Sequence, residues 1–236
     1  MKPARFLCLL DPSIPFSRNS FLRHDDLEGL TIWKPLIDTE LNEIFFTYPD
    51  KEVIHYLEHS LASLHPIGFL SISRAYTLNP DYPLDSWVLI QDHINWNQHN
   101  PMTALSQKSG KSVEFHDIKQ FYQNLAQRVE RNAGPWIFDD RRGTLIGFDS
   151  PSLFSPAEIQ WLRASGGDLI DCFTLPLIFW CFANSVPLLP LAWIAQNPQN
   201  PSPLPSFDFD SFLHGIRDLL PLFETSTTQQ EACYDA

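Results

Sequence analysis

Basic residues are scarce in this chain of 236 residues. Lys and Arg number 16 against 28 Asp and Glu, which gives a formal net charge of −12 at pH 7. Proteins that bind a phosphate backbone depend on clustered Lys and Arg side chains. Aromatic residues make up 13% of the chain, but no basic stripe runs between them. The composition therefore argues against a nucleic-acid partner.

Several sequence motifs of catalysis and cofactor binding are missing. There is no GxGxxG and no GxxxxGK[ST], so dinucleotide-binding and P-loop functions have no support. There is no GxSxG for a serine hydrolase. His55 and His59 stand four residues apart beside Glu58, but the order is not HExxH and no third ligand is evident. A solvated helix face explains the two histidines better than a metal site, and no metal is expected.

The cysteine pattern does not indicate disulfide bonds. Cys8, Cys172, Cys181 and Cys233 lie far apart, and none forms a CxxC pair. Reduced, mostly buried thiols in a cytoplasmic protein are the expectation. The apolar stretch near the N-terminus ends at Asp11, which is too soon for a signal peptide.

One long hydrophobic run, residues 173–195, carries no charge and is long enough to cross a bilayer. Asn184 and Ser185, followed by Pro187 and Pro190, divide the run into two pieces. A buried helix followed by a buried parallel strand has the same hydrophobic profile. We expect that arrangement and no membrane partner.

The remaining pattern is that of a globular α/β protein, since 44% of residues are hydrophobic and 19% charged. Strands are predicted at residues 5–10, 31–37, 43–48, 67–72, 87–91 and 143–148. Helices are predicted at residues 50–65, 115–131 and 155–166, and around residues 209–220. No linker divides the chain, so residues 1–224 are expected to form a single domain, with residues 225–236 as a flexible tail.

Two stretches carry a family resemblance. The first, LNPDYPLDSWVLIQDHINWNQHNPM, starts at Leu78. The second begins at Gly143-Thr144 and continues through Ser150-Pro151-Ser152, Ala157-Glu158, Gly166, Asp168, Thr174 and Pro176. They resemble, in the same order, the segments LNP…GD…LI.DHIN…NP and GTY…GPSFET…GAD…MSTVPE of the trimeric purine nucleoside phosphorylase family.

This resemblance implies a twisted mixed β-sheet flanked by helices, assembled as a homotrimer. It implies a purine nucleoside as ligand and, in an active enzyme, inorganic phosphate as co-substrate with no further cofactor. Cleavage of the N-glycosidic bond passes through an oxocarbenium-like transition state. The contribution expected of the protein is therefore positioning and electrostatic stabilisation.

The phosphate-binding positions differ from the family pattern. Where the family has a loop rich in Ser and Gly, this chain reads Asp11-Pro12-Ser13, so only Ser13 remains as a candidate. For the Arg-x-His phosphate clamp the nearest residue is His55, without the Arg. Arg74 is a candidate for a replacement cation.

The nucleoside-binding positions differ as well. Ala75 falls in the place of the AAGG loop, and Leu153-Phe154 falls on the base-binding Phe-Glu pair. A phenyl ring cannot accept a hydrogen bond from the base, as a carboxylate does. Cys172 and Thr174 flank Phe173 in the place of the Met-Ser-Thr element that contacts ribose and phosphate. Gln196, with Asn197 beside it, aligns with the base-binding Asn.

Two classes of function remain open. The first is a divergent phosphorylase or hydrolase with a remodelled pocket. For a hydrolase, Asp149 and Asp171 are the available carboxylates, and Asp171 lies where the hydrolytic relatives carry a Glu. The second is a noncatalytic homologue that binds a ligand or serves in an assembly. An open pocket at Thr174 favours the enzyme, whereas Phe154 and Phe173 filling that pocket favour the noncatalytic role.

Overall fold

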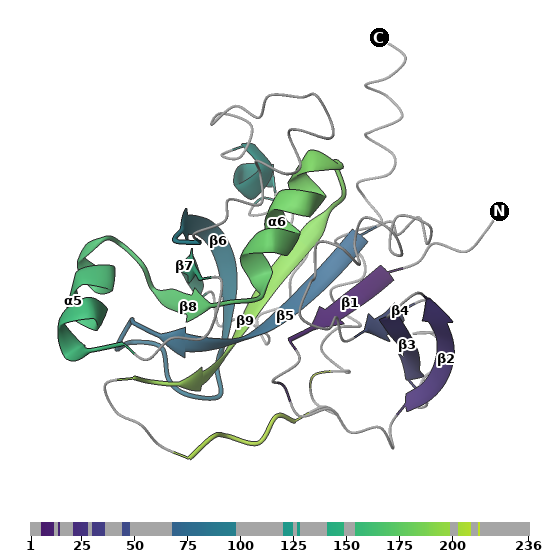
Figure 1. The fold of residues 1–236 in the computed structure, drawn as a ribbon, viewed down its shortest axis with the longest axis horizontal. Helices are drawn as coiled ribbons and strands as arrows, with labels where there is room; N and C mark the ends of the chain where they lie inside the picture. The colour runs from purple at the N-terminus through teal and green to yellow at the C-terminus, as the bar shows by residue number, and fades with distance from the viewer. Residues whose placement is uncertain are drawn as a thin grey trace, which may run out of the picture.

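The computed structural model describes residues 6–11, 14, 21–27, 30–35, 44–47, 68–97, 120–124, 127, 141–148, 154–198, 203–208 and 212. Nine strands and two helices with defined bounds lie within these ranges, and residues 120–124, 127 and 212 are also helical (Figure 1). The strands are β1 (Phe6–Leu10), β2 (Phe21–Leu27), β3 (Leu30–Pro35), β4 (Ile44–Thr47), β5 (Gly68–Thr77), β6 (Trp87–Asn95), β7 (Arg142–Gly147), β8 (Leu169–Asp171) and β9 (Leu188–Gln196). The helices are α5 (Pro156–Ala164) and α6 (Thr174–Ala183).

The strands form one mixed sheet in the order β2-β3-β4-β1-β5-β8-β7-β6-β9. Strand β9 also pairs with β5, in parallel from Phe69 and Leu188 onwards. The five strands β5, β8, β7, β6 and β9 therefore close on themselves, and the other four extend from β5 as an open sheet (Figure 1). This arrangement confirms the predicted α/β class with a twisted mixed sheet and flanking helices.

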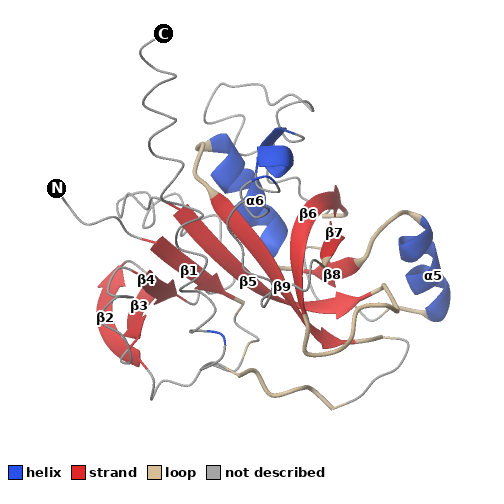
Figure 2. Cartoon of the chain, turned by 180° about the vertical axis from the view of Figure 1, so that it is seen from behind, coloured by secondary structure: helices blue, strands red, loops and turns tan. Residues whose placement is uncertain are grey.

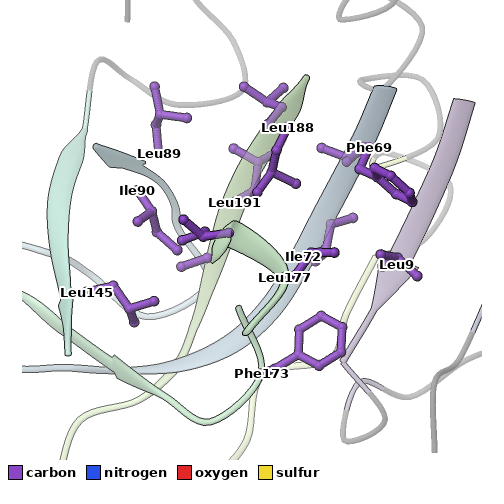
Figure 3. Close-up of a cluster of buried hydrophobic side chains, with 14 of the residues drawn as sticks. Leu9, Phe69, Ile72, Leu89, Ile90, Leu145, Phe173, Leu177, Leu188 and Leu191 are labelled. Atoms are coloured by element: carbon purple, nitrogen blue, oxygen red, sulfur yellow. The ribbon is translucent and has the colours of Figure 1, made fainter. Parts of the chain in front are cut away.

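Two apolar clusters lie on opposite sides of β7 and β8, because side chains alternate along a strand. Leu145 and Leu169 belong to the main core, in which α6 packs against β5 and β9 (Figures 1 and 2). Their chain neighbours Ile146 and Ile170 belong to a smaller cluster under α5. Figure 3 shows the centre of the main core, with side chains from β1, β5, β6, β7, β9 and α6. The sheet thus separates the environments of the two helices.

The uncharged run at residues 173–195 forms a helix and a strand, as expected. Helix α6 ends at Ala183 and strand β9 begins at Leu188, with Asn184 and Ser185 in the turn between them. Ser185 adopts φ of 56° there. Eight of the nine β9 residues are buried. Among the helices that the structure describes, none combines the length and the apolar character needed to cross a bilayer.

All six predicted strands are present, and β5 and β6 are longer than predicted. Ser155 caps α5 in a capping box with Glu158, and Pro156 follows at the first helical position, as the sequence predicted. Residues 120–124 and 127 are helical, within the predicted helix 115–131. The predicted helix 50–65 and the tail 225–236 lie outside the described residues. Strands β2 and β8 were not predicted.

Residues that carry the family resemblance hold loops together. The carboxylate of Asp168 accepts hydrogen bonds from the Asn79 side chain at 2.9 Å and from the Thr144 backbone N–H at 3.0 Å. This joins the Leu78-Asn79-Pro80 turn to β7. Asp85, with φ of 62°, accepts a bond of 2.8 Å from the indole N–H of Trp193. These residues fix the shape of the sheet ends.

We predict that Gly147→Ala destabilises the fold, because α6 approaches β7 too closely for a side chain there. A Cβ at this position would lie 2.6 Å from Leu175 Cδ2 and 2.8 Å from Leu175 Cβ. Overpacking of this kind costs about 1–3 kcal/mol. The free energy of unfolding from urea titration measures the loss. Gly143→Ala, whose Cβ would meet its nearest atoms at 3.2 Å, serves as the control with a smaller loss. Equal stability of the Gly147 variant and the wild type would contradict the predicted close contact.

Candidate functional site

The candidate site lies where β6, β7 and β8 end together. These strands run in parallel, with Asn95 paired to Gly147 and Gly147 paired to Asp171. The carboxyl ends of parallel strands are the usual place for ligands in open α/β sheets. Helix α6 starts three residues after Asp171, so its amino-terminal end points to the same edge.

Asp171 is bound within its own chain. Its side chain is 2% exposed, and Oδ1 accepts backbone N–H bonds of 3.2 Å from both Phe173 and Thr174. Its Oδ2 accepts a bond of 2.5 Å from the Thr174 hydroxyl. Phe173, the N-cap residue of α6, has no side-chain bond to the helix. The Asp171 carboxylate therefore satisfies the donors at the start of α6.

Burial raises the pKa of Asp171 above its ordinary value of 3.8. The neighbouring hydroxyls of Ser73 and Thr174 lower this pKa in part, and the charge of Asp11 raises it further. Ser73 is fully buried and faces the carboxylate, but its geometry falls short of a hydrogen bond. Two carboxylates thus lie near each other at the ends of β1 and β8.

Thr174 and Phe173 leave no open surface at the position where the resemblance implies contacts to ribose and phosphate. Thr174 is 0% exposed, and its hydroxyl donates to Asp171. The Phe173 ring lies in the main core, near Leu9 and Ile72 (Figure 3). Cys172 is half-buried between Asp171 and Phe173. A ligand could reach the Thr174 hydroxyl only after the start of α6 had moved.

Arg74 and Ala75 occupy strand β5 and not a loop. Ala75 is buried in the main core and pairs with Ile194 of β9. The Arg74 backbone N–H donates to the Asp11 carboxylate at 3.2 Å, and the Arg74 side chain is half-buried. The backbone of this segment is therefore used for pairing between strands and for holding the end of β1.

Gln196 ends β9 opposite Tyr76, and Tyr76 also pairs with Ile170 next to Asp171. The Gln196 Oε1 atom is buried without a hydrogen-bond partner. Asn197 follows it and is half-buried. Strand β5 therefore lies between Gln196 on β9 and Asp171 on β8.

Phe154 does not join this group. It packs on Phe148 with ring centroids 5.1 Å apart, and both rings belong to the cluster under α5. Asp171 and Thr174 lie on the α6 side. The candidates Leu153, Ser13 and His55, and the alternative carboxylate Asp149, lie outside the described residues.

A half-buried histidine and a buried tyrosine form a pair beside the site that was not predicted from the sequence. His93 Nδ1 lies 2.7 Å from the Tyr122 hydroxyl, and the His93 ring meets Phe179 of α6 edge-on at 5.0 Å. Burial lowers the pKa of His93 and raises that of Tyr122, and the charges of Asp92 and Asp171 raise the Tyr122 pKa further. The DHIN motif contains the histidine, but no local signal identifies a partner 29 residues away.

No group of three or more His, Cys, Asp or Glu side chains in the described part of the chain is placed to hold a metal ion. The chemistry available at the site consists of buried carboxylates, hydroxyls and one histidine. Such groups can accept and donate hydrogen bonds and exchange protons.

The chain is similar in sequence to purine nucleoside phosphorylases. It is 29% identical over 103 residues to purine nucleoside phosphorylase 1 of Geobacillus stearothermophilus, which covers 42% of this chain and 36% of the relative. It is 25% identical over 125 residues to the enzyme of Mycobacterium tuberculosis, covering 52% and 42%. The matched segments thus span about two fifths of the curated relatives. No family model matches the sequence.

Solved structures of purine nucleoside phosphorylases have the same fold. One, in complex with ribose-1-phosphate, is 12% identical with a TM-score of 0.55 and covers 93% of this chain and 88% of its own. A schistosomal enzyme in complex with hypoxanthine is 13% identical with a TM-score of 0.55 and the same coverage. The resemblance to purine nucleoside phosphorylases is confirmed, and the architecture is theirs.

We predict that Asp171→Asn removes a pH dependence of stability. An acid whose pKa is raised on folding binds its proton more tightly in the folded state than in the unfolded chain. Its stabilisation is present below the ordinary Asp value of 3.8 and is lost as pH rises through the raised folded pKa. The free energy of unfolding of the variant, relative to wild type, should therefore increase as pH rises from the ordinary Asp value of 3.8 through the raised folded pKa. A difference that stays constant with pH would contradict the raised pKa.

Proposed function

We propose that this chain is a purine nucleoside phosphorylase-like protein that binds a purine nucleoside or its base, with standard phosphorolysis weak or lost. The likeness in sequence and fold supports nucleoside phosphorylase-like function at the level of the family. The arrangement around Asp171 supports the loss of phosphorolysis. The proposal includes a homotrimer, which the resemblance implies, a single domain, and a cytoplasmic location, which the cysteine pattern favours.

The observation that carries the proposal is the occupied end of α6. A helix N-terminus attracts an anion through its unpaired N–H groups and its dipole. Here the Asp171 carboxylate already takes the N–H groups of Phe173 and Thr174 and the Thr174 hydroxyl. A phosphate at this place would compete with a covalently attached anion. It would also meet the charge of Asp11, which lies near enough to raise the Asp171 pKa.

The residues at the base-binding positions also support a changed role. Phe154, in place of the family's base-binding Glu, packs on Phe148 in the cluster under α5 and has no acceptor for a hydrogen bond from a base. Gln196 has a buried oxygen without a partner and could accept a hydrogen bond from a ligand on local movement. A protein that binds a nucleoside without phosphorolysis would retain the fold and lack the anion site.

Hydrolysis is the second candidate, and one observation favours it. The pKa of Asp171 is raised, which suits a carboxylic acid that gives a proton to a departing base. Its burial and its bond to Thr174 oppose this role, because the leaving group would have to reach an enclosed side chain. The alternative without catalysis is a noncatalytic homologue that binds a ligand or serves as a subunit of an assembly.

The test is release of free base from inosine, guanosine and methylthioadenosine, each with and without inorganic phosphate. We expect release with phosphate to be at background, together with measurable binding of a nucleoside by calorimetry. Asp171→Asn and Thr174→Val are measured beside the wild type, because both alter the end of α6 while keeping its size.

Release that depends on phosphate would contradict the proposal and would require an anion site elsewhere. Release without phosphate that disappears in Asp171→Asn would establish the hydrolase. Absence of both release and binding, with the protein shown folded by circular dichroism, would leave the assembly role.

A further inference from the structure

Two tryptophans meet at the surface beside the candidate site. The rings of Trp96 and Trp161 lie edge-to-face, with centroids 4.8 Å apart and planes at 72°. Their side chains are 46% and 51% exposed. Only Leu204 is comparably exposed among the large hydrophobic residues that the structure describes. An edge-to-face pair leaves ring faces open to solvent, so this pair presents aromatic surface that the fold does not bury.

Both rings are carried on fixed backbone. Trp96 directly follows β6, and its N–H donates to the Gly147 carbonyl at 3.0 Å. Trp161 lies on α5, which is held by the capping box of Ser155 and by the buried side chains of Ile159 and Leu162. A pre-positioned aromatic pair loses little conformational freedom when a ligand binds.

The pair belongs to the edge where the parallel strands end. Trp96 bonds to Gly147 of β7, and Phe148, the next residue, donates to the Asp171 carbonyl at 3.0 Å. Neighbouring strands are about 4.8 Å apart, so Trp96 stands about 10 Å from the end of β8. Phe148 and Phe154 pack against the cluster under α5, the helix that carries Trp161. Four aromatic rings thus gather at one corner of the sheet.

The size of the pair fits a flat small molecule better than a protein. A fully buried aromatic side chain covers about 150–250 Å², so two half-exposed rings offer about 200 Å². A stable protein interface requires about 800 Å² on each partner. The net charge of −12 also disfavours an anionic ligand. An uncharged planar heterocycle is small enough for this surface and carries no negative charge.

We propose that Trp96 and Trp161 form a stacking site for the planar base of a purine nucleoside or for the free purine. This inference rests on the proposed function and assigns base recognition to two residues that lie within the two resembling stretches but match no residue of the family segments. Recognition through ring faces replaces recognition by a carboxylate at the position of Phe154. Every purine has a π-face, so the site discriminates weakly between 6-oxo and 6-amino purines.

The experiment is isothermal titration of the full chain with hypoxanthine, adenine and inosine. Trp96→Ala and Trp161→Ala should each weaken binding of all three probes about tenfold or more. Trp96→Phe and Trp161→Phe should retain binding within about threefold, since a phenyl ring still stacks. Leu204→Ala removes an equally exposed apolar side chain and should leave binding unchanged. Hypoxanthine and adenine should bind the wild type within about fivefold of each other.

Three outcomes would overturn the inference. If the wild type binds a probe and both Ala variants bind it equally well, the base lies elsewhere and the proposed function stands. If the folded wild type binds none of the probes, the proposed function fails as well. If sedimentation velocity shows that either Ala variant changes the oligomeric state, the pair is an interface between copies of the chain.

Discussion

Helix α6 begins without help from its own N-cap residue, and the Asp171 carboxylate supplies what is missing. Unpaired N–H groups at a buried helix start cost free energy, so they require an acceptor. Asp171 accepts from Phe173 and Thr174 and also from the Thr174 hydroxyl. The interaction links the end of β8 to the helix that covers β5 and β9. Because this anion is part of the chain, the position of α6 and the chemistry of the candidate site both depend on the Asp171 carboxylate.

The residues that carry the family resemblance and those that carry the proposed chemistry have different tasks. Asn79 and Asp168 join a turn to β7, and Asp85 holds the indole of Trp193. These hydrogen bonds stabilise the fold whatever ligand the protein binds, because they satisfy buried or strained backbone and hold the strand ends in place. At the site positions, Phe154 and Phe173 are apolar and packed in the two clusters, so they contribute to the stability of the fold instead of contacting a ligand. The fold therefore persists while the site changes.

Local signals in the sequence predicted much of the fold. The capping box at Ser155 and the break of the hydrophobic run at Asn184 to Pro187 depend on neighbouring residues only, and both predictions were confirmed. Pro190 does not break the run, because it lies within strand β9. Strand β2 was missed because its sequence, FLRHDDL, is charged, and β8 because it has only three residues. The closure of the sheet through β5 and β9 depends on pairing across more than a hundred residues. The His93–Tyr122 and Trp96–Trp161 contacts also join residues that are far apart in the sequence, so no local pattern predicted them. The burial of Thr174 could not be predicted from its residue type.

The closure of the five strands into a ring also determines which strand edges remain open for pairing with another chain. A strand at an open edge offers unpaired N–H and C=O groups to any other extended chain, and a closed ring has no such edge. Within the described strands, β9 is paired on both sides, by β6 and β5, and the open edge is that of β2 at the far end. Strand β2 carries Arg23, Asp25 and Asp26, and its pairing with β3 shifts register between Arg23 and Asp25. A charged sequence and a bulge are among the features by which natural sheets resist templated aggregation, so this edge, among the described strands, is a poor template for a second molecule.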